Sequence, residues 1–209
     1  MAAFSTDIEP VQNLGGAVSF PVLQIIEEAS QTFVAGTPVQ INSSDGGVQA
    51  WDGTTTTAGI AGIAQVNANN LSTTGAGAPQ GFTPVLGPGS YIGSYAANAA
   101  QASAVITPPM VPFSEGLMAF FAASPGTVFA AVIGSSSGTP AAVATAATQV
   151  GAAYGLTKDP VNAYWYVDTN KTGGSAVVRI TQIDPRQAVG TVGGLVWFVF
   201  LNSAAQIFA

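Results

Sequence analysis

The sequence predicts an all-β protein built from two small sandwich- or barrel-like modules, with an extended N-terminal arm and at most one short helix. Short runs rich in β-branched and aromatic residues recur along the chain, and such side chains fit the pleated surface of a sheet. The 25 glycines and 13 prolines are scattered among these runs and favour turns. With 209 residues, the chain is long enough to bury a sizeable core.

Residues 1–32 are interpreted as the N-terminal arm. They contain a Gly15-Gly16 break, and Phe20 precedes a proline, which biases its backbone toward extended geometry. Phe4 and Phe20 are the candidate anchoring side chains of this arm. The same residues are also compatible with an ordinary edge strand of the first module, and the sequence does not choose between the two interpretations.

Residues 33–112 are predicted to form the first β-module with a loop-rich extension. Its strand-like runs are separated by Asp-Gly-Gly and Asp-Gly steps, where glycine adopts a positive φ at little cost. Residues 67–112 are poor in long apolar side chains. We nevertheless expect short strands near 82–86 and 103–107, because a structureless stretch of this length is unusual inside a compact domain.

Residues 113–209 are predicted to form a barrel-like second module that begins with strands near 117–122 and 127–133. A short helix is expected over 139–151, where a threonine N-cap, a proline in the first turn and a terminal glycine provide helix boundaries.

Two further runs, 161–167 and 176–183, are joined by a polar turn that contains glycine, which predicts a hairpin. Period-two alternation places two pairs of apolar residues on shared faces of these strands: Trp165 with Val167, and Val178 with Ile180.

The final run, 195–201, is apolar on both faces. A strand at the surface of an antiparallel sheet normally carries polar residues on one side, so both faces are expected to be covered. One face belongs to the core of the module, and the other meets a further layer of the chain or a second subunit. We assign Val196, Phe198 and Phe200 to this outward face.

Charge is scarce throughout the chain. Only 7% of the residues are charged, the net charge is −6, and all four basic residues follow residue 157. A nucleic-acid-binding protein needs cations to displace phosphate counterions, so direct binding to DNA or RNA is disfavoured. The surface of a soluble monomer is about a quarter charged or more. The uncharged surface therefore predicts assembly with other subunits.

The mean hydropathy of +0.41 raises the question of a membrane segment. The longest apolar stretch, 117–134, is interrupted by Ser-Pro-Gly-Thr, and the N-terminus carries acids where a secretion signal needs positive charge. We expect neither a membrane span nor a secretion signal. The chain has no cysteine, which excludes disulfides and zinc–thiolate sites.

Two motifs suggest chemistry, and their context argues against it. Residues 134–138 read Gly-Ser-Ser-Ser-Gly, the pattern of a hydrolase nucleophile, but the chain has no histidine to take the serine proton. Residues 168–173 begin like a calcium loop, yet Lys171 lies inside the loop and Arg179 stands where the closing glutamate belongs. We expect turns at both places, and neither an enzyme nor a cofactor or metal site.

Several sequence patterns together resemble structural proteins of tailed bacteriophages. The series FVAGTPVQI, GGVQAWDGTTT and AGIAGIA, from residue 33 onward, resembles small β-modules of head decoration, or cement, proteins. The C-terminal series VGAAYGL, WYVD, AVVRITQIDP and GGLVWFVFLNSAAQ is similar to a barrel-like module of phage virion proteins. These patterns cover about two thirds of the chain, and the middle third has no counterpart.

The resemblance implies a structural virion protein that binds the outer surface of a capsid, commonly as a trimer, and bridges capsid subunits. The implied partners are the major capsid protein and other copies of the chain, with no direct nucleic-acid or membrane contact. Its location would be the capsid surface, after assembly in the host cytoplasm. The candidate contact residues are Phe4, Phe20 and the outward set on the last strand.

A receptor- or glycan-binding module of a tail fibre or surface adhesin is the alternative hypothesis. Trp51 and Trp165 would then form a stacking platform, because exposed aromatic rings suit the faces of sugars. The burial of the two indoles distinguishes the hypotheses: exposed rings favour a glycan site, and packed rings favour a structural role.

Overall fold

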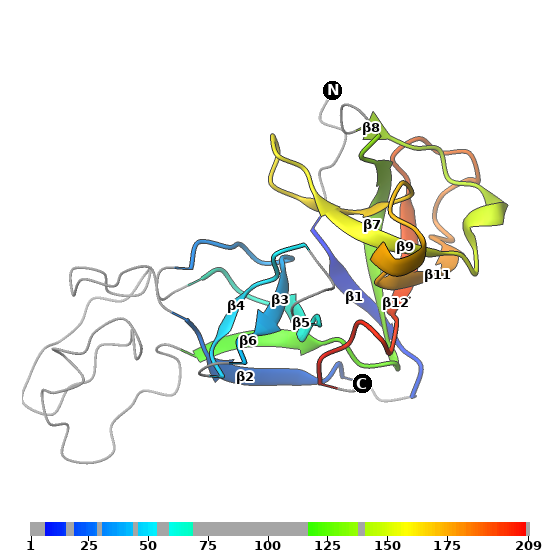
Figure 1. Cartoon of the computed structure of the whole chain (residues 1–209). Helices are drawn as coiled ribbons and strands as arrows, with labels where there is room; N and C mark the ends of the chain where they lie inside the picture. Colours follow the sequence, from blue (N-terminus) through cyan, green and yellow to red (C-terminus); the bar gives the residue numbers. More distant parts are fainter. Residues whose placement is uncertain are drawn as a thin grey trace, which may run out of the picture.

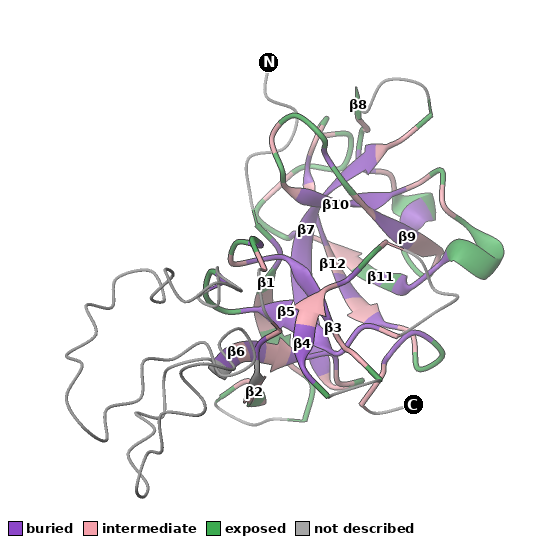
Figure 2. Cartoon of the chain, turned by 60° about the vertical axis from the view of Figure 1, so that its left-hand side comes forward, coloured by how far each residue is buried: buried purple, intermediate pink, exposed green. Residues whose placement is uncertain are grey.

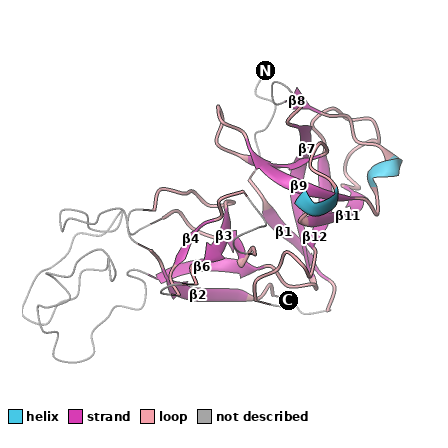
Figure 3. Ribbon diagram, viewed as in Figure 1, coloured by secondary structure: helices cyan, strands magenta, loops and turns pink. Residues whose placement is uncertain are grey.

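The computed structural model describes residues 7–15, 19–28, 31–43, 46–53, 59–68, 117–137 and 141–207. Within these residues the protein is almost entirely β, as predicted. Helical structure there is limited to two single 3-10 turns, η1 (Ala147–Gln149) and η2 (Gly173–Ser175) (Figure 3). The described strands form two sheets, one of seven strands and one of five, which lie side by side (Figure 1).

Five strands of the larger sheet close into a barrel. β7 pairs on one side with β10, and at the other end of the ring β12 pairs back onto β7, giving the closed order β7-β10-β9-β11-β12. Closure removes exposed strand edges, which are otherwise open to pairing with other chains. β1 and β8 add to β7 outside the ring. The strands of this sheet are β1 (Glu9–Asn13), β7 (Thr127–Ser135), β8 (Ala141–Ala142), β9 (Ala153–Lys158), β10 (Trp165–Asp168), β11 (Val178–Ile183) and β12 (Leu195–Phe200).

β7 is the central strand of the barrel, because it pairs with β1, β8, β10 and β12. Its sequence TVFAAVIGS is buried at every position except the last (Figure 2). A strand covered on both faces shows a continuous apolar run without alternation, and β7 has that pattern. The strands predicted near 117–122 and 127–133 coincide with β6 and with most of β7.

The second sheet has the order β2-β6-β5-β3-β4. In the hairpin between β3 and β4, Gly46 has a φ of 78° and donates its N–H to Asn42 O (2.9 Å), as expected for a glycine at the predicted turn. Gly62 is required on β5, because a Cβ there would lie 2.2 Å from the carbonyl oxygen of Phe121 on the next strand. The strands are β2 (Val22–Ile26), β3 (Pro38–Ile41), β4 (Val48–Ala50), β5 (Gly62–Ala64) and β6 (Leu117–Ala122).

The two sheets share one continuous core. The rings of Phe129, Phe198 and Phe200 pack together inside the barrel, with centroids 5.3–5.9 Å apart. The same apolar cluster includes Trp51 and Ile63 from the side of the second sheet. The opposite face of the second sheet has its own cluster, formed by Phe33, Val39, Ala61, Ala64, Val48, Ala68, Met118 and Phe120.

The C-terminal segment connects the sheets. After β12 the chain returns to the second sheet, where Gln206 N donates to Ile60 O (2.9 Å). The Gln206 side chain accepts a hydrogen bond from Ile41 N and donates one to Ile41 O, both at 2.7 Å. A single amide side chain thus takes the place of a neighbouring strand at Ile41, the end of β3 that lies beyond its pairing with β5.

The predicted N-terminal arm is wrong for its described residues. Residues 9–13 form β1, which pairs with β7, and residues 22–26 form β2, which pairs with β6. Only β2 agrees with the alternative interpretation, an edge strand of the first module, because β1 belongs to the barrel sheet. The predicted boundary near residue 112 does not separate the sheets either, because β6 follows it in sequence yet lies inside the second sheet.

The predicted hairpin between residues 161–167 and 176–183 is also wrong. β9 lies between β10 and β11 and pairs with both. Its sequence AYGLTK carries Gly155, which weakens the strand pattern. The position requires glycine, because a Cβ added there would lie 2.6 Å from the Cβ of Lys171. The predicted faces are confirmed: Trp165, Val167, Val178 and Ile180 are buried in the barrel core.

No helix forms over 141–151, where one was predicted. The described residues form β8 and the single turn η1 instead. The Gln149 side chain accepts from Ala146 N (2.8 Å) and donates to Ala144 O (3.2 Å), so side-chain bonds replace those of a continuing helix. β-branched Val and Thr residues in this segment also reduce helix propensity. The short strands expected near 82–86 and 103–107 lie outside the described residues.

Candidate functional site

The outward set predicted on the last strand faces the core instead. Val196 and Phe198 are fully buried and Phe200 is 3% exposed. Because successive side chains of a strand alternate, the other three residues of β12 face outward: Leu195, Trp197 and Val199, each half-buried. The sequence shows two apolar faces on this strand without showing which one lines the barrel. Val196, Phe198 and Phe200 are therefore corrected from contact residues to core residues.

Of the two candidate anchoring side chains, Phe4 and Phe20, the structure describes only Phe20. Phe20 is half-buried and contacts Phe121 edge to face, with ring centroids 6.0 Å apart. It packs on β6 and keeps part of its surface exposed. Phe4 lies outside the described residues, and its role stays a prediction.

The two indoles of the alternative hypothesis are packed. Trp51 is 4% exposed and Trp165 is 7% exposed, and their ring centroids lie 5.5 Å apart inside the shared core. A sugar-stacking platform needs an exposed ring face. The arrangement of these indoles favours a structural role.

The two motifs that suggested chemistry meet at one buried carboxylate, that of Asp168. Its oxygens accept hydrogen bonds from Ser136 N (3.0 Å), Asn170 N (3.0 Å) and Thr157 Oγ1 (2.6 Å). Burial alone would raise the pKa of Asp168, but these hydrogen bonds lower it below 3.8. Lys171 Nζ donates to Leu156 O (3.0 Å). The hydrogen bonds hold the two loops against each other as a structural unit.

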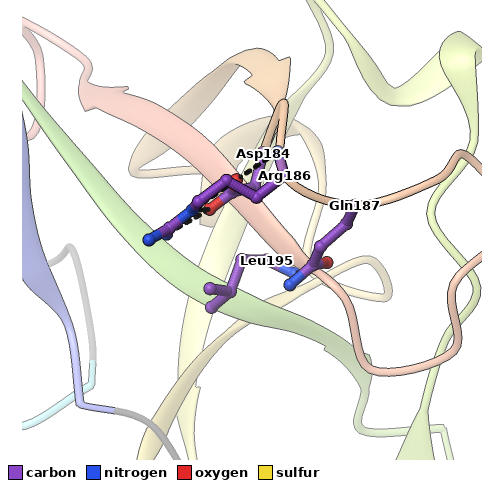
Figure 4. A network of polar contacts seen from close by, with 4 residues as sticks. All are labelled: Asp184, Arg186, Gln187 and Leu195. Carbon is purple, nitrogen blue, oxygen red and sulfur yellow. Dashed lines mark hydrogen bonds and ion pairs between the residues drawn. The ribbon is translucent and has the colours of Figure 1, made fainter.

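A second carboxylate, Asp184, organises the loop between β11 and β12 (Figure 4). Arg186 Nε and Nη2 donate to its two oxygens at 2.9 and 2.6 Å, and these bonds lower the pKa of Asp184 to about 2. Gln187 Oε1 accepts from Leu195 N (2.8 Å), and Asp184 N donates to Leu195 O (3.1 Å). The start of the loop is thereby fixed to the first residue of β12.

The far part of the same loop exposes apolar side chains. Val189 is 62% exposed and Val192 is 67% exposed. Val192 forms an isolated antiparallel bridge with Ala144, flanked by bonds from Thr145 N to Thr191 O (3.0 Å) and from Gly193 N to Val143 O (2.9 Å). We define the apolar loop patch by the residues that these two segments present: Val143, Ala144, Ala188, Val189 and Val192.

Further hydrogen bonds hold the apolar loop patch in one conformation. Gly190 N donates to Thr145 O (2.8 Å), and Thr191 Oγ1 donates to Ala188 O (2.7 Å). Exposed valines on a loop fixed in this way lose little conformational entropy when a partner covers them. The sequence alone does not reveal this patch, because its two segments are about 45 residues apart and the only local sign is that Val189 and Val192 each precede a glycine.

A groove of about 450 Å³ lies at the C-terminal end of β12. Arg179 is exposed there and lies directly opposite Val199 in the β11–β12 register. A guanidinium beside an apolar wall suits an acidic side chain of another protein. The residues that line the groove are Pro125, Arg179, Val199, Phe200, Leu201, Asn202 and Ser203.

Comparison with known proteins identifies no relative: no family model, curated protein or solved structure matches the chain. In the part of the chain that the structure describes, no helix has the length and apolarity needed to cross a membrane. The same residues contain no group of three or more acidic side chains placed to hold a metal ion.

Proposed function

We propose that this protein is a structural virion protein that binds the outer surface of a phage capsid and stabilises it by bridging capsid subunits. In this role it contacts the major capsid protein and further copies of itself, commonly as a trimer, at the capsid surface. The sequence patterns that resemble decoration proteins support this role, as does the scarcity of charged residues.

The apolar loop patch is the single observation that carries the proposal. It presents branched side chains that water solvates poorly, on loops already fixed by the barrel. Burial of apolar surface contributes about 25 cal/mol per Å², and a capsid repeats each such contact at many equivalent sites. Small contacts of this kind therefore sum to a large stabilisation of the shell.

The test compares the thermal stability of capsids with and without this protein. Capsids stripped of the protein are expected to rupture at a lower temperature and to recover when the purified chain is added back. A double variant, Val189→Ser with Val192→Ser, is expected to bind about tenfold more weakly or worse, because two apolar contacts are lost.

The matched control is Val161→Ser, which makes the same change on the β9–β10 turn, where the valine is 86% exposed. This variant should restore capsids as well as the unmodified chain does. Equal rupture temperatures with and without the protein would exclude the proposed role. Full recovery with the double variant would exclude the apolar loop patch as the contact.

A further inference from the structure

The groove at the C-terminal end of β12 is lined by hydrogen-bond donors that have no partner. Arg179 is exposed there, and no hydrogen bond or ion pair of the described residues involves its guanidinium. Asn202 and Ser203 are exposed at the same groove, and within the described part of the chain their backbone N–H groups donate no hydrogen bond. The lining contains no acidic residue. This set of donors suits a carboxylate, which accepts hydrogen bonds at both oxygens.

The barrel holds Arg179 in a fixed position. Arg179 lies opposite Val199 in the β11–β12 register and opposite Ala153 in the β11–β9 register. The half-buried Val199 offers an apolar wall to the aliphatic part of the arginine side chain. The guanidinium is thus presented from a strand with neighbours on both sides, which reduces the entropy lost when it pairs.

Most of the acidic side chains are already bonded within the chain. Asp7 and Glu9 are the exceptions, because neither carboxylate forms a hydrogen bond or an ion pair with any part of the structure described. Both residues are exposed. The charge of Glu9 also acts on Arg186, but that guanidinium is already bonded to Asp184. The partnered acids among the described residues are Glu27, Glu28, Asp52, Asp159, Asp168 and Asp184.

The segment that carries these two unpaired acids is anchored to the fold. Ile8 lies between them, is 2% exposed and packs in the shared core. Asp7 lies against Gly36, where an added Cβ would come within 2.4 Å of the Asp7 Cβ. Burial raises the pKa of Asp7, because its carboxylate loses water without gaining a hydrogen bond. A cation from another chain would offset this cost.

The acidic segment and the groove lie on different sides of the barrel. Phe129 and Ala130 of β7 each pair with both β1 and β12, so these two strands lie on opposite edges of β7. β11, which carries Arg179, lies beyond β12. Figures 1 and 2 both show β7 and β12 between β1 and β11. The carboxylate that fills the groove of one copy therefore comes from another molecule.

We propose that the segment Asp7–Glu9 of one copy docks into the Arg179 groove of the next copy, head to tail. Each copy presents one unpaired acidic segment and one unpaired cationic groove, so every junction neutralises both. Contacts between two different surfaces build rings when the rotation between copies closes. This inference rests on the part of the proposed function in which copies of the chain contact one another, and it names the surfaces that meet.

Charge reversal in the full chain tests the contact. Sedimentation velocity of the purified chain over a range of concentrations should show oligomers larger than a dimer. Arg179→Glu should raise the dissociation constant about tenfold or more, and Asp7→Lys with Glu9→Lys should do the same. The three substitutions together reverse both surfaces and should restore assembly. The control Lys158→Glu reverses an exposed cation outside the groove and should leave assembly unchanged.

Engineered cysteines locate the contact. The chain has no cysteine of its own, so an introduced pair reports without background. Mild oxidation of Glu9→Cys with Ser203→Cys should link copies into a ladder beyond the dimer on a denaturing gel without reductant. The control pair, Glu9→Cys with Lys158→Cys, places one thiol outside the groove and should give no such ladder.

Three results would overturn the proposal. The first is a chain that stays monomeric at all concentrations, and the second is an assembly that Arg179→Glu leaves intact. The third is a cysteine ladder that is equally strong with the control pair. These experiments use the purified chain without capsids, so their failure would leave the capsid-binding proposal standing.

Discussion

Asp168 shows how one buried charge fixes the segments around it. Its side chain is fully buried, and its three hydrogen-bond donors come from three different segments of the chain. An ionised carboxylate in such a place is stable only when its oxygens are bonded. The charge of Asp168 therefore acts locally, where it fixes the segments that meet at this turn.

Replacement of Asp168 by Asn should destabilise the fold by about 2–4 kcal/mol, because an amide nitrogen would then face donors in a buried site. Urea unfolding monitored by tryptophan fluorescence measures the effect. The comparison variant Thr157→Val removes only one of the three donors, so it should cost about 1 kcal/mol. Equal stability of Asp168→Asn and the unmodified chain would contradict the structural role of this carboxylate.

At the scale of elements, sequence pattern identifies strands better than it identifies their partners. β6, β7 and β12 were predicted because their runs of β-branched and aromatic residues are long. β9 was missed because glycine and lysine interrupt its pattern, and its absence produced the wrong hairpin. Pairing between β2 and β6 joins residues almost a hundred positions apart, and no local signal encodes it.

The candidate site was harder to predict than the fold, for a physical reason. Alternation assigns residues to two faces of β12, but both faces are apolar, so hydrophobicity cannot say which one lines the barrel. The exposed Val189 and Val192 each directly precede a glycine, in a sequence that resembles any turn. Their exposure follows from the bridge between Ala144 and Val192, which only the folded chain reveals.

The C-terminal segment should open locally when Gln206 is replaced by Ala. The backbone N–H and C=O of Ile41 would lose their partners, at about 1–2 kcal/mol for the pair. Hydrogen exchange at the Ile41 amide should accelerate by about tenfold, since local opening takes place below the global unfolding free energy. Asn202→Ala changes an exposed residue of the same segment and serves as the control. Unchanged exchange at the Ile41 amide would contradict this role of the Gln206 side chain.

At the scale of the whole molecule, three buried aspartates fix the turns that follow the barrel strands. Asp159, Asp168 and Asp184 are each buried, and each lies at or directly after the end of a barrel strand. Asp159 accepts hydrogen bonds from Val161 N (2.8 Å) and from Asn162 Nδ2 (2.8 Å). The same arrangement at three turns makes the stability of the barrel depend on pH.

The pKa of each of these three carboxyls is lowered in the folded protein. For Asp159 and Asp168, hydrogen bonds outweigh the effect of burial, and for Asp184 the bonds from Arg186 lower the pKa to about 2. The unfolded chain then binds more protons than the folded chain between its ordinary aspartate pKa, about 3.9, and these lower values. Stability is therefore fully present above this window and falls as the pH falls through it.

We expect the melting temperature to be nearly constant from pH 7 to pH 5 and to fall steeply between about pH 4 and pH 2. The Asp184→Asn variant should be less stable at neutral pH. It should also lose less stability on acidification, because it lacks one of the three carboxyls whose protonation favours unfolding. Calorimetry at a series of pH values measures both effects. Since Arg186 is 68% exposed, part of the contribution of Asp184 is screened, and added salt should reduce the difference between the variant and the unmodified chain. A melting temperature that rises on acidification below pH 4 would show that these carboxylates do not stabilise the barrel.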